Sequence, residues 1–223
     1  MMELVAYPSR GALASGLAGV IASELRSALA KGAATLSVPG GTTPGPVFDA
    51  LAAEDLDWSR VAVLLNDERW VDETNPRSNT RLLRERLFVN HAAKARLLPL
   101  YAPTVTPEEA LGKLSEGILP HLPITVLLLG MGADMHTASL FPGADKLAQA
   151  LASNAPVLMA LRAEAAGEPR ITLSAPVLKQ AGHIHILITG PEKRAALERA
   201  RGLPPLQAPI RTVLDRATVH WAD

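Results

Sequence analysis

The sequence predicts an α/β protein with a Rossmann-like, mainly parallel sheet and helices on both faces. Expected strands and helices alternate along all 223 residues, which is typical of successive β-α-β units. Residues 126–129 form a continuous apolar run, as in a strand that is covered on both faces. With 48% hydrophobic residues, this length suits a single domain over residues 1–223, with room for a small additional lobe.

The first half of the chain is expected to hold three strands, each followed by a helix. Leu13, Leu17 and Ile21 recur at helical spacing behind Ser9, a suitable cap, and Gly32 stands where a helix should end. The expected elements are strand 4–7, a helix from Ser9 to Lys31, strand 35–38, helix 46–53, strand 61–65 and helix 80–87.

The second half continues this alternation. Thr106 and Pro107, followed by two glutamates, favour a helix start, and residues 184–189 alternate as a strand does. The expected elements are strand 96–100, helix 107–119, central strand 126–129, helix 146–151, strand 156–161, the segment 170–173, a helix beginning at Ser174 and Pro176, strand 184–189, helix 194–201, and the end segments 210–214 and 218–221.

The composition argues against several classes of protein. Lys plus Arg and Asp plus Glu both number 22, so no overall field would attract nucleic acid or an anionic membrane. The absence of cysteine excludes disulfides and thiolate metal sites. The first ten residues lack an apolar signal core, and no apolar run is expected to reach transmembrane length. We therefore expect a cytoplasmic protein.

An acid and an imidazole follow the central strand. Gly130 and Gly132 end that strand, and Asp134 and His136 come next, where open α/β sheets place their ligands. An imidazole can take a proton from water near neutral pH, and a carboxylate beside it can orient the ring. From these residues alone, a catalytic His136 and an ordinary polar turn both remain open.

A glycine-rich turn joins the second expected strand to its helix. Gly40 and Gly41 let the backbone approach a ligand closely, and Thr42 and Thr43 add hydroxyls beside the free N–H groups of a helix start. This combination favours phosphate binding, although neither a Walker loop nor the dinucleotide fingerprint is present. A plain turn with proline punctuation is the alternative.

Four polar residues follow the third expected strand. Asn66, Asp67, Glu68 and Arg69 stand at its carboxyl end, which places them in the same crevice of the sheet. A solvated ion-pair turn is the alternative interpretation of this segment.

Together these segments resemble the 6-phosphogluconolactonase family, within the larger glucosamine-6-phosphate isomerase/deaminase-like superfamily. The block at residues 130–143 is highly specific, whereas the other segments are weak singly and strong together. The resemblance implies a NagB/RpiA/CoA-transferase-like fold. The segments that carry it, in the family's order, are residues 39–44 (PGGTTP), 66–69 (NDER) with 78–79 (SN), 130–143 (GMGADMHTASLFPG), 170–173 (RITL) and 189–193 (TGPEK).

The resemblance implies hydrolysis of 6-phospho-D-glucono-1,5-lactone to 6-phospho-D-gluconate in the oxidative pentose phosphate pathway, without a metal ion or an organic cofactor. It implies that His136 is the base that activates water and that Asp134 and Asp67 are acids of the same pocket. A monomer or a weak homodimer is expected. The residues expected to bind the substrate and its phosphate are Gly40, Gly41, Thr42, Thr43, Arg170 and Lys193, with Arg69 near the lactone or the phosphate.

The chain departs from the family pattern in two places. Ala133 and Met135 stand where the family usually has Glu and Gly. The loss of that glycine raises the question of whether Met135 must adopt a positive φ, which is uncommon for such a residue. Pro39 stands where Ser or a similar small residue is common, so the phosphate loop has one hydroxyl fewer.

Two other functions compete with the lactonase. The first is an amino-sugar phosphate deaminase or isomerase of the same fold, whose members carry a Glu five residues after the His. Phe141 occupies that position here and cannot transfer a proton, which favours the lactonase. The second is a non-catalytic sugar-phosphate-binding protein, against which the presence of Asp67, Asp134 and His136 argues.

Overall fold

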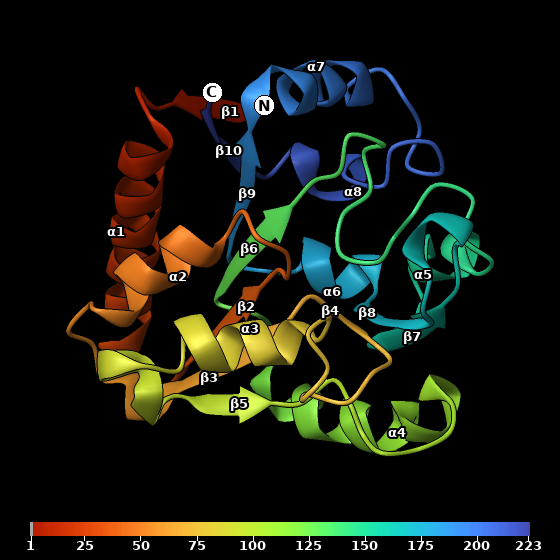
Figure 1. The fold of residues 1–223 in the computed structure, drawn as a ribbon, viewed down its shortest axis with the longest axis horizontal. Helices are drawn as coiled ribbons and strands as arrows, with labels where there is room; N and C mark the ends of the chain where they lie inside the picture. The colour runs from red at the N-terminus through yellow and green to blue at the C-terminus, as the bar shows by residue number, and fades with distance from the viewer. Residues whose placement is uncertain (1) are drawn as a thin grey trace.

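The computed structural model describes residues 2–223 and contains two sheets of different kinds (Figure 1). The large sheet is parallel throughout, which confirms the predicted fold class. Its strands lie in the order β1 (Glu3–Ala6), β10 (Thr218–Ala222), β9 (His183–Thr189), β6 (Val126–Gly130), β2 (Ala34–Val38), β3 (Val61–Leu65) and β5 (Arg96–Leu98). The small sheet is antiparallel, in the order β4 (Asp67–Arg69), β8 (Arg170–Leu173) and β7 (Leu158–Leu161).

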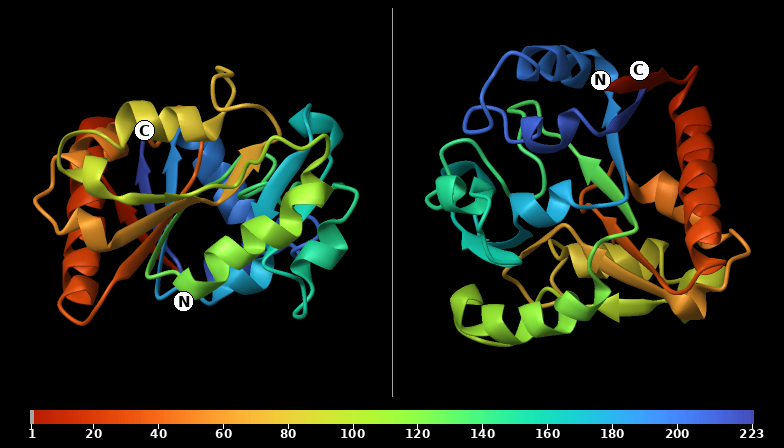
Figure 2. Two further views of the ribbon diagram at one scale, coloured as in Figure 1. Left: turned by 90° about the horizontal axis from the view of Figure 1, so that it is seen from below. Right: turned by 180° about the vertical axis from the view of Figure 1, so that it is seen from behind.

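Helices cover both faces of the large sheet (Figures 1 and 2). Helices α1 and α2 pack against each other on one side, whereas α6, α8 and the small sheet lie on the other. The helices are α1 (Arg10–Leu29), α2 (Gly45–Ala52), α3 (Asn79–Arg86), α4 (Pro107–Ile118), α5 (Leu147–Leu151), α6 (Ala175–Lys179), α7 (Gly190–Ala200) and α8 (Arg211–Leu214). Short 3₁₀ helices are η1 (Trp58–Arg60), η2 (Asn90–Lys94), η3 (Leu119–His121) and η4 (Glu164–Ala166).

The polar stretch after β3 is not a solvated turn, which was one of the two interpretations of this segment. It forms β4, which pairs with β8 so that Arg69 lies opposite Arg170. Asp67 and Glu68 are buried rather than exposed. The partner strand comes from a distant part of the chain, so tertiary contacts and not local propensity make this segment a strand.

Helix α1 is more apolar than the sequence interpretation allowed. Within residues 2–223 it is long and apolar enough, by length and composition alone, to cross a membrane, with a mean hydropathy of 1.2. The sequence interpretation considered uninterrupted apolar runs, and Glu24 and Arg26 interrupt this helix. Leu17, Ile21 and Leu25 are fully buried in the fold, so the core accounts for the apolar character of the helix.

A chain of hydrogen bonds joins α1 to the edge of the large sheet that contains β9 and β10. The Tyr7 hydroxyl lies 2.9 Å from His220 Nδ1, His220 Nε2 lies 3.0 Å from His185 Nδ1, and His185 Nε2 lies 2.8 Å from Glu24 Oε2. Because an ionised carboxylate only accepts hydrogen bonds, every donor in the chain points toward Glu24 when both imidazoles are neutral. Burial, together with the neighbouring His185, lowers the pKa of His220 to about 4.

We predict that stability falls as the pH drops from about 6.5 to about 4. The unfolded chain binds a proton at His220 in this range and the folded chain does not, so the neutral imidazole stabilises the fold above that range and loses the contribution within it. The loss from this group is about 3 kcal/mol, measured as the free energy of urea unfolding at several pH values. His220→Leu should flatten this pH dependence, whereas the exposed-residue control His91→Gln should keep it.

Candidate active site

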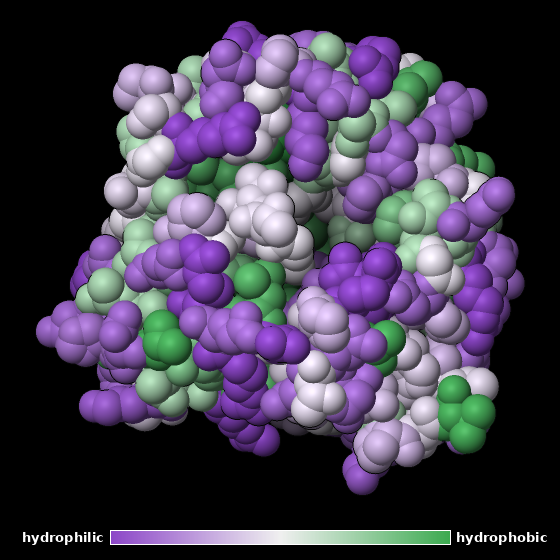
Figure 3. Space-filling view, in the orientation of Figure 1, coloured by the Kyte–Doolittle hydropathy of each residue, from purple (hydrophilic) through white to green (hydrophobic). Residues whose placement is uncertain are grey.

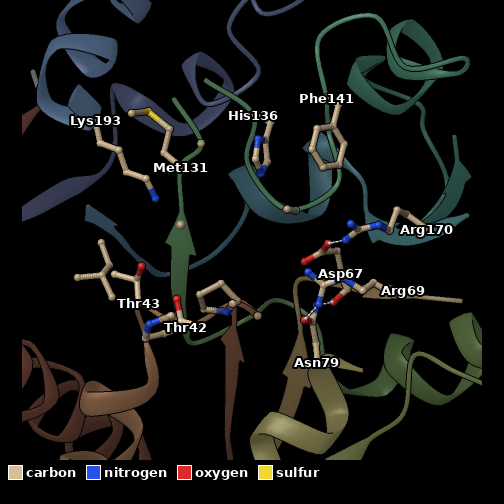
Figure 4. Close-up of a pocket in the computed structure, with 18 of the residues that line it drawn as sticks. Thr42, Thr43, Asp67, Arg69, Asn79, Met131, His136, Phe141, Arg170 and Lys193 are labelled. Carbon is tan, nitrogen blue, oxygen red and sulfur yellow. Dashed lines mark hydrogen bonds and ion pairs between the residues drawn. The ribbon is translucent and has the colours of Figure 1, made fainter. Parts of the chain in front are cut away.

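A cavity of about 400 Å³ opens at the carboxyl edge of the large sheet, on a face that is hollowed near its middle (Figures 3 and 4). Four adjacent strands, β9, β6, β2 and β3, lead into the segments that line it, and β8 contributes from the small sheet. Nine of the ten residues predicted for the site line this cavity, namely Gly40, Gly41, Thr42, Thr43, Asp67, Arg69, His136, Arg170 and Lys193. The tenth, Asp134, is not among the lining residues.

The glycine-rich turn between β2 and α2 forms one wall of the cavity. Gly41 has a φ of 86°, a conformation that glycine adopts without strain. A Cβ atom on Gly40 would lie 2.0 Å from Asn79 Oδ1, so only glycine allows this close approach. Among the residues that the structure describes, no protein acceptor takes the backbone N–H groups of residues 40–43. These donors are therefore available to a bound anion.

Basic side chains reach the cavity from two sides. Figure 4 shows Lys193 on the same side as Thr42 and Thr43, and across from Arg170. Lys193 belongs to the first turn of α7, directly after β9. An anion in the cavity can thus meet a cation on either side of it.

Arg69 and Arg170 are directly opposite each other across β4 and β8, an arrangement in which like charges repel. Arg170 is only 7% exposed, and burial lowers the pKa of its guanidinium from the usual value, while the charge of Asp67 opposes that shift. Its Nη1 lies 3.5 Å from Asp67 Oδ2. Within residues 2–223, neither Arg69 Nε nor Arg170 Nε has a hydrogen-bond partner, so both are free donors in a buried place. An anion would relieve the repulsion.

Asp67 is held at the cavity wall by two groups on the same carboxylate oxygen. Ser139, which is fully buried, donates its hydroxyl to Oδ2, and Arg170 pairs with that oxygen. The other oxygen is not engaged by these two groups. The backbone carbonyl of Asp67 accepts a hydrogen bond of 3.0 Å from the Asn79 side chain, which fixes the start of β4 against α3.

His136 and Asp134 form a hydrogen-bonded pair of 2.6 Å between Nδ1 and Oδ1. Burial disfavours the charge of Asp134, but the hydrogen bond and the charge of His136 outweigh it and lower the pKa of this carboxyl from its usual value. Because the carboxylate accepts, the imidazole donates from Nδ1 and keeps Nε2 free to accept a proton. Asp134 therefore contacts the base and is not among the residues that line the cavity, which is the arrangement expected of a carboxylate that orients an imidazole.

The loop that carries His136 is tightly folded. Met135 has a φ of 68° and Ala138 a φ of 49°, so Met135 does take the positive φ in question. Gly132 donates its N–H to the His136 carbonyl over 3.1 Å. A Cβ atom on Gly132 would lie 2.2 Å from His136 Nδ1, so glycine is needed behind the ring.

Comparisons with known proteins identify the family of the chain. The family model described as glucosamine-6-phosphate isomerases/6-phosphogluconolactonase matches residues 8–221. The chain belongs to this family. Among similar family members, a 6-phosphogluconolactonase of Rhizobium meliloti (strain 1021) is 40% identical, over 99% of this chain and 98% of its own. One of Mesorhizobium japonicum is 43% identical, over 97% of this chain and 94% of its own.

Solved structures of the family have the same fold. The crystal structure of a 6-phosphogluconolactonase from Shewanella baltica OS155 has a TM-score of 0.97 at 34% identity and covers 100% of this chain and 98% of its own. A monomeric glucosamine-6-phosphate deaminase has a TM-score of 0.80 at 16% identity, covers 99% of this chain and 96% of its own, and shares the fold alone.

Several residues of the site were not singled out by sequence reasoning. Ser139 and Asn79 lie inside segments that carry the family resemblance, but nothing local indicates that they hold Asp67 in place. The sequence interpretation used Phe141 only as the residue that stands where the deaminase branch has a glutamate. In the structure its ring stacks on His136, with centroids 4.2 Å apart. Each of these residues lies in a segment that carries the family resemblance, which was the only signal in the sequence. Its role depends on contacts within the folded structure.

We predict that Gly132→Ala displaces the His136 ring and destabilises the protein by about 1–3 kcal/mol, because the added methyl overlaps the imidazole. The measurements are urea unfolding and the ¹⁵N resonances of the His136 side chain. Gly112→Ala is the matched control, since Gly112 is exposed in α4 with open space around it and should gain about 0.5–1 kcal/mol. Unchanged His136 resonances in Gly132→Ala would contradict this account of the loop.

Proposed function

We propose that this protein hydrolyses 6-phospho-D-glucono-1,5-lactone to 6-phospho-D-gluconate, the lactonase step of the oxidative pentose phosphate pathway, with His136 as general base. The observation that carries the proposal is that His136, paired with Asp134, lines a cavity that also holds basic side chains and free N–H groups. The family relationship over nearly the whole chain supports it.

The proposed reaction begins with a water molecule between His136 and C1 of the lactone. Nε2 takes a proton from the water as its oxygen attacks the carbonyl carbon, and Asp134 stabilises the imidazolium through Nδ1. The tetrahedral intermediate then expels the ring oxygen, which receives the proton back from His136. A δ-lactone is an activated ester, so a positioned base that raises the rate by about 10²–10⁴-fold is sufficient for catalysis.

The phosphate of the substrate does no chemistry in this proposal. Its binding orients the lactone and supplies binding energy from a group remote from C1. Arg69 is proposed to lie near the lactone or the phosphate, at the side of the cavity formed by β4 and β8. The groups proposed to hold the phosphate are Gly40, Gly41, Thr42, Thr43 and Lys193, together with Arg170 from the opposite side.

A deaminase or isomerase of the same family is the second candidate, since the family description names both activities. That branch uses a glutamate at the position of Phe141, and the phenyl ring here lies flat against His136. No proton can be exchanged with this ring, which favours the lactonase. A non-catalytic sugar-phosphate sensor would bind without turnover. A lactonase assay, together with an assay of ammonia release from glucosamine 6-phosphate, therefore separates all three.

The proposed reaction needs no metal ion and no organic cofactor, because His136 supplies the base and the lactone is already activated. We propose that residues 1–223 act as a single domain in the cytoplasm, as a monomer or a weak homodimer. The proposed partner is the sugar phosphate lactone, with no binding to nucleic acid or membrane.

We predict that His136→Ala lowers kcat by about 10²–10⁴-fold and changes KM little, because the base acts in the transition state and not in binding. The measurement is a lactonase assay with fresh 6-phosphogluconolactone, run with and without EDTA and corrected for spontaneous opening. His91→Ala, an exposed site, is the control. Near-normal turnover in His136→Ala would refute the base assignment, and a loss of wild-type activity in EDTA would refute the metal-free reaction.

We predict that Lys193→Ala and Arg170→Ala each raise KM by about 10- to 150-fold, the equivalent of one charge-assisted hydrogen bond of about 1.5–3 kcal/mol. The exposed Lys113→Ala controls for the loss of a positive charge. A raised KM in Lys193→Ala alone would confine the phosphate to the side of the glycine-rich turn. An unaltered KM in both variants would mean that the phosphate binds elsewhere.

A further inference from the structure

Phe141 contacts both a proposed catalytic group and a proposed binding group. Its ring is 7% exposed and stacks on the His136 imidazole, with centroids 4.2 Å apart and planes at 27°. The guanidinium carbon of Arg170 lies 5.8 Å from the centroid of the same ring. Figure 4 shows the phenyl ring beside His136 and toward Arg170 at the edge of the cavity.

The segment that carries this ring is anchored by buried polar contacts. Thr137 donates its hydroxyl to the Gly130 carbonyl over 2.9 Å, which ties the loop to the end of β6. Ser139 is fully buried and donates to Asp67, which ties the loop to β4. Phe141 lies two residues after Ser139, beyond the fully buried Leu140, so its backbone position is set by both sheets and not by an exposed loop.

The hydrogen bond to Asp134 constrains only one edge of the His136 imidazole. A hydrogen bond tolerates a range of angles, so coupled rotation about Cα–Cβ and Cβ–Cγ can still tilt the ring while Nδ1 keeps its contact with the carboxylate oxygen. A flat partner in van der Waals contact removes this freedom, because an aromatic face accepts a ring only in a narrow range of tilts. The ring of Phe141 provides that face, and with it the direction of Nε2 is defined.

We propose that Phe141 is a positioning residue, whose ring fixes the plane of the His136 imidazole and holds the Arg170 guanidinium at a set place beside it. This inference rests on the proposed lactonase function. It assigns to one side chain the relative placement of the base and of a buried cation, Arg170. A misplacement of about 1 Å between reacting groups lowers rates by about a hundredfold, so such a residue affects catalysis without touching the water.

The competing explanation is that Phe141 merely fills space in the core. The two explanations differ in which replacements restore activity. A space-filling role is served by Leu or Met, which are apolar and of similar size. A positioning role requires a flat ring, so Tyr retains it and Leu or Met does not.

The test compares Phe141→Leu, Phe141→Met and Phe141→Tyr with wild-type protein in the lactonase assay. We expect Leu and Met to lower kcat by about 10- to 100-fold and Tyr to stay within about threefold of wild type. Phe88→Leu is the matched control, since Phe88 also lies under an arginine, Arg84 at 5.6 Å, but lines no part of the cavity. It should leave kcat unchanged.

The second measurement is the proton resonances of the His136 ring. Stacking on a phenyl ring shifts them upfield, and we expect the shift to persist in Phe141→Tyr and to vanish in the Leu and Met variants. A folded Leu or Met variant with wild-type kcat would overturn the proposal. Unfolding of both at 25 °C would assign Phe141 to the core and overturn it as well. An inactive wild-type protein would instead refute the proposed function itself.

Discussion

The carboxyl edge of the large sheet depends on one buried amide, that of Asn66. Its side chain accepts a hydrogen bond of 2.7 Å from Ser37 on β2 and donates one of 2.8 Å to the Leu128 carbonyl on β6. Its backbone N–H donates to the Val38 carbonyl on β2. Its backbone carbonyl accepts from the N–H of Leu173, the last residue of β8 in the small sheet. Because it is fully buried, any of these groups left unpaired would cost about 1–3 kcal/mol. The two sheets are thereby joined at the edge where the cavity opens.

The electrostatics of the site follow from this junction. The chain has no net formal charge, so attraction for an anion has to come from a local arrangement. The pairing of β4 with β8 places Arg69 opposite Arg170. Asp67, the first residue of β4, pairs with Arg170 and accepts a hydrogen bond from the buried Ser139. Two like charges tolerate such proximity when a counter-charge is at hand, and Asp67 offsets only part of it. Arg170 also feels the charge of Glu168, and both Arg69 and Arg170 line the cavity.

Local patterns sufficed for part of this structure and failed for the rest. The apolar run of β6 and the residues after it predicted both the central strand and the His136 loop, because burial and chain order are visible in sequence. The strand β4 was missed because its polar residues become strand only by pairing with β8. The buried bond between His185 and Glu24 spans 161 residues, and no local signal marks such a pair. Sequence patterns therefore identify the reactive groups better than the groups that hold them.

The free-energy cost of the backbone conformation in the His136 loop shows why the residues that anchor this loop matter. Met135 and Ala138 both take a positive φ, which costs about 1–2 kcal/mol for each residue with a side chain. A loop with few anchors would relax out of this conformation and carry His136 away from the cavity. Here the bond between Thr137 and the end of β6, and that between Ser139 and Asp67, oppose the relaxation. The direction of the imidazole thus depends on both sheets, and a change that loosens their junction would alter the position of Nε2.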